Sequence, residues 1–180
     1  MLEISNLSKT FNKNTINEKI ALDHINLTLK EGDFVTVIGG NGAGKSTLLN
    51  AICGAWNIDA GKILLDGINI TNMADYKRAK FLGRVFQDPM MGTAGEMEIA
   101  ENLAIANRRS KRRTLRWGMK KQEKANYQTL LAQLDLGLEN RLTSKVGLLS
   151  GGQRQALTLL MATLQKPKLL LLDEHTAALD

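Results

Sequence analysis

The residues of this chain that could do chemistry begin with a glycine-rich stretch at residues 39–47. The stretch fits the G-x-x-x-x-G-K-[ST] pattern, in which glycines let backbone amides approach a polyphosphate closely. The residues that we predict to bind a nucleotide here are Gly39, Gly40, Asn41, Gly42, Ala43, Gly44, Lys45, Ser46 and Thr47. Lys45 would bring an ammonium group to the outer phosphates, and the Ser46 hydroxyl would ligate Mg²⁺. The sequence therefore predicts that the chain binds a nucleoside triphosphate.

Two elements must position this loop. Residues 34–38, Phe-Val-Thr-Val-Ile, are apolar and rich in β-branched side chains, which predicts a buried parallel strand before the loop. After the loop, Leu48, Leu49 and Ile52 recur at helical spacing, which predicts a helix that begins near Lys45. The positive end of that helix would then face the phosphates.

Three further positions carry candidate chemistry. Phe11 lies between a predicted strand and a turn, and is either a partly buried core ring or a surface on which a base can stack. Gln87 follows the predicted strand 83–86, at the edge where open α/β sheets bind ligands. Asp173 follows four leucines, so its carboxylate would be held rigidly where it can serve a hard cation or its bound water.

The remaining elements predict an α/β fold with two additions. Alternating apolar and polar residues before residue 38 predict a small antiparallel sheet, and residues 61–70 predict a hairpin around Asp66-Gly67. A short helix is predicted over 74–81. From residue 88 to 149 the apolar period is helical, so we expect residues 1–87 and 150–180 to form the α/β core and 88–149 an inserted helical subdomain.

Composition sets the class of protein. A hydrophobic fraction of 43% in 180 residues suits one ordinary globular domain, and no apolar run is long enough to span a membrane. The N-terminus lacks the pattern of a signal peptide, so we expect the protein to stay in the cytosol. The single cysteine, Cys53, rules out an internal disulfide and is most simply a core residue.

The positive charge is concentrated in residues 108–121. This basic segment contains eight cations and no carboxylate, so the rest of the chain carries 6 − 8 = −2. The cations are Arg108, Arg109, Lys111, Arg112, Arg113, Arg116, Lys120 and Lys121. Because like charges repel, we expect the segment to be neither buried nor stable as an isolated helix. It is either a solvated loop or, with Leu115, Trp117 and Met119 among the cations, a contact for an anionic bilayer.

With the phosphate loop, Gln87, Leu-Ser-Gly-Gly-Gln at 149–153 and Asp173-Glu174 in this order, the sequence resembles the ATP-binding subunit of an ABC transporter. The resemblance runs over essentially the whole chain. The pentad at 149–153 is the signature of this family and separates the chain from kinases, GTPases and helicases, which share only the loop. The resemblance implies a P-loop NTPase fold of the ABC type, with a small antiparallel β subdomain and an inserted α-helical subdomain.

The resemblance also implies roles for individual residues and two cofactors, ATP and Mg²⁺. Phe11 matches the aromatic residue that stacks on adenine. The implied Mg²⁺ environment is Ser46, Gln87 and Asp173, and the implied catalytic residues are Glu174, Lys45 and Gln87, with Glu174 polarising the attacking water. The implied contacts of the signature with ATP are made by Ser150, Gly151, Gly152 and Gln153. In this family they face the phosphate loop of a second subunit, so a homodimer is expected.

The function implied is an ATPase that energises a separate transmembrane permease at the cytoplasmic face of the membrane. Residues 87–94 and Asp-Glu-His-Thr at 173–176 resemble a subgroup of bacterial importers that work with an extracytoplasmic solute-binding protein, some of them for aromatic amino acids. The alternative is a soluble ABC ATPase that acts on nucleic acid or ribosomes, and a third reading is a degenerate cassette that binds ATP only as a scaffold. Intact Lys45, Asp173 and Glu174 argue against the scaffold. Nucleic acid is disfavoured because such proteins usually have two cassettes or a coiled-coil insertion.

Two departures from the family pattern stand out. His175 takes the place of the usual proline after the catalytic glutamate, and the family's switch histidine, which follows 177–180 by some tens of residues, is not in this sequence. We therefore expect the 180 residues to be a C-terminally truncated part of a longer subunit. We expect this part by itself to hydrolyse ATP poorly.

Overall fold

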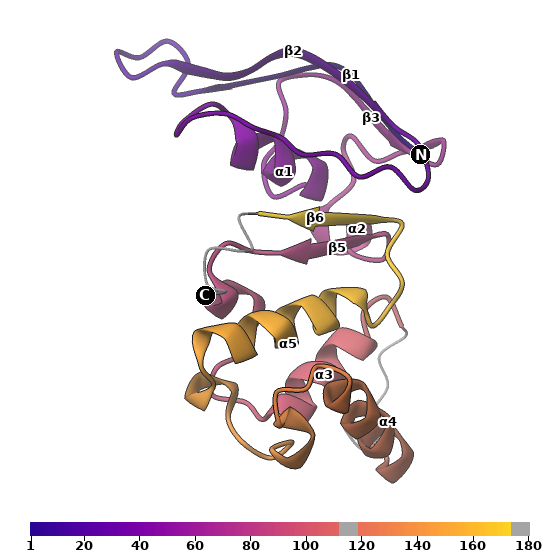
Figure 1. The fold of residues 1–180 in the computed structure, drawn as a ribbon. Coiled ribbons are helices and arrows are strands. Elements are labelled where there is room, and N and C mark those ends of the chain that lie inside the picture. The colour runs from indigo at the N-terminus through magenta and orange to yellow at the C-terminus, as the bar shows by residue number, and fades with distance from the viewer. Residues whose placement is uncertain (112–118, 174–180) are drawn as a thin grey trace. The chain divides into compact units, whose positions relative to one another are not determined.

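The computed structural model describes residues 1–111 and 119–173 (Figure 1). The chain divides into two compact units, residues 1–79 and 80–180, and each is described by itself. The predicted core boundary after residue 87 thus falls inside the second unit.

The first unit contains a four-stranded antiparallel sheet with strand order β2-β1-β3-β4 (Figure 1). Its strands are β1 (Leu2–Phe11), β2 (Lys19–Leu29), β3 (Ala60–Leu65) and β4 (Ile68–Asn69). The predicted alternation is confirmed for Leu2 and Ile4, which are buried, whereas Ile20 of β2 is 63% exposed. The hairpin predicted around Asp66-Gly67 is also confirmed: both residues have positive φ, 48° and 76°, as a tight two-residue hairpin turn requires.

Two helices accompany this sheet, α1 (Lys45–Cys53) and α2 (Asp75–Arg78). Helix α1 begins at Lys45 as predicted, whereas α2 is shorter than the predicted 74–81. The side chain that joins them is Arg78, which is only 4% exposed. Its guanidinium donates hydrogen bonds to the carbonyls of Ala51 and Ile52, in the last turn of α1, at 2.8 Å each. Since the last carbonyls of a helix have no partner within it, Arg78 completes the end of α1.

The strand predicted at residues 34–38 is wrong for this structure. The segment is not a strand, and Phe34 and Ile38 are 86% and 89% exposed. Apolar β-branched residues indicate a tendency to extend, but a strand also needs a neighbour that accepts its hydrogen bonds. Among the described residues this segment has no ladder partner.

The second unit contains a pair of parallel strands, β5 (Leu82–Val85) and β6 (Leu169–Leu172), paired from Leu82↔Leu169 to Val85↔Leu172. Its helices are α3 (Ile99–Asn107), α4 (Lys121–Ala132) and α5 (Gly151–Thr163), with 3₁₀ turns η1 (Pro89–Gly92), η2 (Leu138–Asn140) and η3 (Val146–Leu148). In the described part of 88–149 the only β pairing is one isolated bridge, so the predicted helical character is confirmed.

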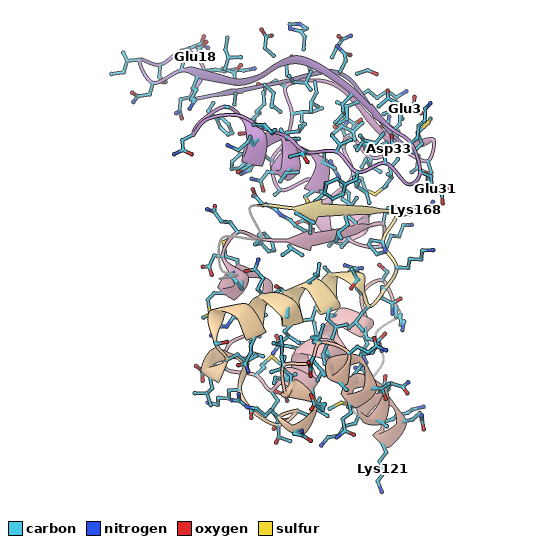
Figure 2. All side chains as sticks on the ribbon, viewed as in Figure 1. Glu3, Glu18, Glu31, Asp33, Lys121 and Lys168 are labelled. Carbon is cyan, nitrogen blue, oxygen red and sulfur yellow. The ribbon has the colours of Figure 1, made fainter. Side chains whose placement is uncertain are left out.

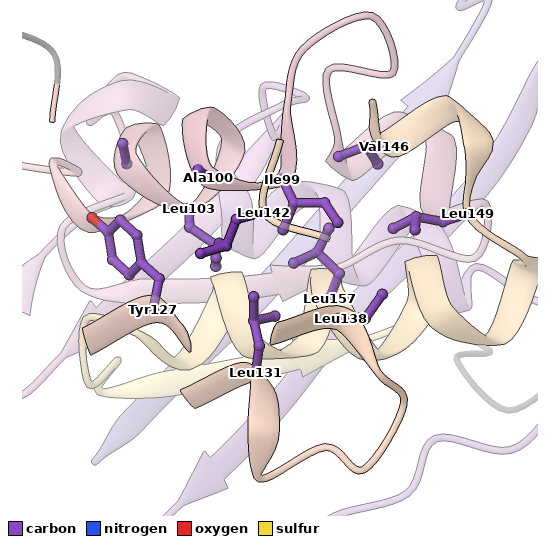
Figure 3. Packing of buried hydrophobic residues seen from close by; sticks show 11 residues of the cluster. Ile99, Ala100, Leu103, Tyr127, Leu131, Leu138, Leu142, Val146, Leu149 and Leu157 are labelled. Carbon is purple, nitrogen blue, oxygen red and sulfur yellow. The ribbon is translucent and has the colours of Figure 1, made fainter. Parts of the chain in front are cut away.

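A single apolar cluster holds the helices of the second unit together (Figure 3). Ile99 and Leu103 of α3, Leu131 of α4 and Leu157 of α5 are all fully buried in it. Helix α5, which carries the 149–153 pentad at its start, therefore packs on the predicted helical subdomain.

Charged side chains extend from the surfaces of both units. Glu18 lies at the tip of the β1–β2 hairpin, and Lys121 begins α4 (Figure 2). Within residues 1–111 and 119–173, no helix has the length and apolar character needed to cross a bilayer.

Candidate nucleotide-binding site

The phosphate loop has a backbone that only glycine adopts easily. Gly42 and Gly44 have φ of 79° and 90°, and Gly44 is the N-cap of α1. A Cβ built on Gly44 would overlap the backbone carbonyl oxygen of Ala21 in β2, so the loop lies directly against that strand. Glycine is therefore required at residue 44 both for its backbone angle and for the close approach.

Lys45 bends back over this loop. Its Nζ donates hydrogen bonds to the carbonyl oxygens of Gly39 and Gly40, at 2.7 and 3.1 Å. These neutral acceptors are weaker partners for an ammonium group than phosphate oxygens are. The side chain is thus held at the loop in a position from which it can transfer to an anion.

A second cation, which the sequence did not single out, lies beside the loop. The Nζ of Lys19 would be 2.9 Å from a Cβ on Gly42, so its ammonium occupies the space next to that glycine. Lys19 is also the cross-strand partner of Phe11. It therefore links the phosphate loop with the predicted base-stacking residue. From the sequence, period-2 alternation could only assign Lys19 to one face of a strand. Its approach to Gly42 depends on how β2 passes the loop, which the sequence pattern does not specify.

Phe11 is the last residue of β1 and is partly buried. Its ring is perpendicular to that of Trp56, at 82° with centroids 5.0 Å apart, and the Nζ of Lys9 lies 5.4 Å from its centroid. The ring is supported from one side by an aromatic neighbour without being enclosed in a core.

In the second unit, Gln87 and Asp173 follow the carboxyl ends of neighbouring parallel strands. Val85 pairs with Leu172, and the backbone N–H of Asp173 donates to the carbonyl of Val85 at 3.2 Å. Gln87 lies two residues beyond β5 and is exposed. The predicted edge therefore gathers an amide and a carboxylate. Glu174 and His175 lie outside the described residues.

The signature pentad forms the start of α5. Ser150 is the N-cap: its Oγ accepts from the Gln153 backbone N–H at 3.3 Å, and its own N–H donates to the Gln153 side chain at 3.2 Å. Gly151 and Gly152 occupy the first two helical positions, where backbone N–H groups have no acceptor inside the helix. Ser150 and Gln153 thus hold each other, and the two glycine amides are presented at the positive end of the helix.

The expectation for the basic segment is partly wrong. Arg108 pairs with Glu123, at 3.0 Å, just beyond the segment. Arg109 is partly buried and donates to the carbonyls of Ala162 and Gln165, where α5 ends; burial lowers the pKa of its guanidinium. Both arginines find partners that are distant in sequence, so the absence of carboxylates inside the segment did not keep them in solvent. Residues 112–118 lie outside the described residues.

No three or more His, Cys, Asp or Glu side chains gather as a metal site within the described residues. The donors expected near the nucleotide are instead one hydroxyl, one amide oxygen and one carboxylate, from Ser46, Gln87 and Asp173. All three are oxygen donors, the kind that Mg²⁺ prefers, and only one of them is a carboxylate; phosphates and water would complete the shell of the ion.

A known family matches most of the chain. The family described as "ABC transporter" matches residues 22–177. The chain belongs to this family. Its fold is accordingly that of a P-loop ATP-binding cassette, as the order of motifs predicted.

Named relatives and solved structures agree with this membership. The chain is 47% identical over 185 residues to a tyrosine transport ATP-binding protein of Clostridioides difficile, covering all of this chain and 71% of that protein. It is 36% identical to a spermidine/putrescine import ATP-binding protein of Haemophilus influenzae, of which it spans 44%. A dimeric ATP-binding cassette in a post-hydrolysis state with ADP and Pi matches with a TM-score of 0.84 and 28% identity, over the whole chain and 76% of that cassette. A nucleotide-free ATP-binding cassette matches with a TM-score of 0.76 and 29% identity, over 98% of this chain and 70% of that cassette.

Proposed function

We propose that this chain binds Mg²⁺-ATP at its phosphate loop, hydrolyses it in a dimer and thereby energises a bacterial solute importer. The observation that carries the proposal is the arrangement at the start of α1. The Lys45 ammonium rests on the carbonyls of Gly39 and Gly40, beside glycine amides at the positive end of the helix.

ATP would bind by replacing neutral partners with charged ones. The β- and γ-phosphate oxygens would take the Lys45 ammonium from the two carbonyls and accept hydrogen bonds from the loop amides. Lys19 would add a second positive charge next to Gly42. At the other end of the nucleotide, Phe11 would stack on the adenine.

Hydrolysis would need a second subunit. When bound, Mg²⁺ would neutralise charge on the phosphates, with Ser46, Gln87 and Asp173 as its nearest protein donors. Glu174 would orient and polarise the attacking water. The Gly151 and Gly152 amides would meet the γ-phosphate held by the partner's loop. The expectation of a dimer is supported by two solved cassettes of this fold that are themselves dimeric.

The transport partners are inferred from the relatives. A permease would dock this subunit at the cytoplasmic face of the membrane, with a solute-binding protein on the other side. We favour an aromatic amino acid over a polyamine as the solute because the tyrosine relative is 47% identical and the polyamine relatives are 34–36% identical.

The alternative, an ATPase acting on nucleic acid, has less support. Its main argument was the basic segment, and Arg108 and Arg109 are already engaged within the protein. A bilayer contact by the rest of the segment stays a prediction. Arg112 and Arg113 are the residues to replace, because replacing Arg108 or Arg109 would also disturb folding. Their replacement by Gln should weaken salt-sensitive binding to anionic vesicles.

Two variants test the proposed function in the full-length subunit. Lys45→Met should abolish ATP binding, whereas Lys62→Met, an exposed lysine of β3, should bind as the wild type does. Glu174→Gln should bind ATP normally, hydrolyse it about 10²-fold or more slowly and accumulate as an ATP-bound dimer.

Cells that lack the subunit distinguish the solutes. Wild type should restore uptake of labelled tyrosine and Glu174→Gln should not. Normal hydrolysis by Glu174→Gln, or normal ATP binding by Lys45→Met, would contradict the proposal; restored uptake of spermidine alone would overturn the solute assignment.

A further inference from the structure

The loop that follows α1 reaches the residue that ends β1. Trp56, in this loop, meets Phe11 edge to face, with ring centroids 5.0 Å apart. Trp56 is 39% exposed, so the pair lies at the surface of the unit and is not part of its buried core. An aromatic neighbour in this geometry restricts the tilt of the Phe11 ring, because perpendicular rings at this distance attract each other.

Asp59, three residues further, fixes the backbone on which Phe11 sits. One carboxylate oxygen accepts from the Thr10 backbone N–H at 2.6 Å, and the Asp59 N–H donates to the Ser8 carbonyl at 2.9 Å. Lys9 and Lys13 lie 3.6 and 3.2 Å from the same carboxylate. The hydrogen bond from Thr10 is the main cause that lowers the pKa of Asp59, so the group is ionised at neutral pH.

The same loop is tied to the phosphate-binding helix. Gly54 ends α1 in the left-handed conformation, and the N–H groups of Ala55 and Trp56 donate to the Asn50 carbonyl in its last turns, at 3.0 and 3.4 Å. The loop after Cys53 is therefore tied to the last turns of the helix by these hydrogen bonds, and it carries Trp56 and Asp59, the two side chains that hold Phe11.

We propose that Trp56 and Asp59 are positioning residues for the base of the nucleotide. They hold the Phe11 ring at a set distance and tilt from the phosphate loop, so that adenine and phosphates can bind at the same time. The inference rests on the proposed function, because it requires Phe11 to be the base-stacking residue. Pre-organisation of this kind raises affinity by lowering the entropy lost on binding.

The test compares a ligand that has a base with one that lacks it. Mg²⁺-ATP and tripolyphosphate share the phosphate loop, but only ATP contacts Phe11. In the full-length subunit, Trp56→Ala should weaken ATP binding about 3- to 10-fold, in keeping with the loss of one aromatic pair, and leave tripolyphosphate binding unchanged. Trp56→Phe, which keeps an aromatic ring, should recover most of the loss. Tyr76→Ala removes an exposed ring of the same unit and should change neither affinity.

A second measurement does not depend on how well Trp56→Ala folds. The sequence has two tryptophans, so Trp117→Phe leaves Trp56 as the only one. The fluorescence emission of Trp56 in this variant should change on addition of ATP and not on addition of tripolyphosphate.

The outcomes separate the inference from the proposed function. The positioning role would be overturned if Trp56→Ala weakened the binding of ATP and of tripolyphosphate equally, or if it left ATP binding unchanged. It would also be overturned if the fluorescence emission of Trp56 did not change on addition of ATP. If wild type fails to bind ATP, or binds it independently of Lys45, the proposed function itself is wrong.

Discussion

Replacing Arg78 by Met should destabilise the first unit severely, although residue 78 makes no expected contact with nucleotide. The guanidinium makes four hydrogen bonds to carbonyl oxygens: Nε to Met73 at 2.7 Å, Nη1 to Ala51 and Ile52 at 2.8 Å, and Nη2 to Thr71 at 2.9 Å. Methionine fills a similar length but donates nothing, so these carbonyls would lose a charged donor while they stay partly or fully buried.

The expected loss follows from two opposing effects. Hydrogen bonds that involve a charged group contribute about 1.5–3 kcal/mol each, so four would total roughly 6–12 kcal/mol. Burial of the guanidinium, which also lowers the pKa of Arg78, offsets part of this sum. We expect a net loss of about 3–5 kcal/mol, because each carbonyl left without its donor costs about 1–3 kcal/mol and the removed charge no longer has to be buried.

Urea unfolding of the full-length subunit measures this loss, and hydrogen exchange of the α1 amides locates it. Lys77→Met removes an exposed positive charge one residue away and should change the free energy of unfolding by less than about 0.5 kcal/mol. Arg78→Lys should fall between the two, because an ammonium cannot reproduce the planar fork. A loss below about 1 kcal/mol in Arg78→Met, or unchanged exchange in α1, would refute the argument that Arg78 supports the phosphate-binding helix.

Three further predictions concern the same unit. Gly44→Ala should abolish ATP binding and lower the free energy of unfolding by more than about 3 kcal/mol, since it combines a left-handed backbone with overlap on β2; Gly32→Ala, at φ 86° in open space, should cost only about 1–2 kcal/mol. Lys19→Gln should weaken ATP binding about 3- to 10-fold at low ionic strength and less at 1 M salt, whereas Lys62→Gln should have no effect in the same titration. The folded-state pKa of Asp59 is lowered, so its stabilisation is complete above an unfolded pKa of about 3.9 and is lost as pH falls through the folded value; Asp59→Asn should be less stable than wild type at pH 7, and unfolding curves should show the difference shrinking as pH falls below about 3.9.

The motifs and their order in the chain were enough to predict the family, the antiparallel sheet and the helical region. These features depend on local chemistry: period-2 alternation buries Leu2 and Ile4, and Asp66-Gly67 forms a turn that few other dipeptides can adopt. The start of α1 at Lys45 is local in the same sense, because glycine is needed at the preceding cap.

Only the tertiary structure shows which groups from distant positions satisfy each other. Arg78 completes the end of α1 from 26 and 27 residues away, and Lys19 reaches the loop at Gly42. The basic segment shows the same limit: its charge predicted exposure, yet Arg109 caps the end of α5. The segment at 34–38 has the composition of a strand and forms none among the described residues. A sequence specifies the tendencies of each segment, but hydrogen bonds and ion pairs need partners in space, and the chain path alone decides which partners come within reach.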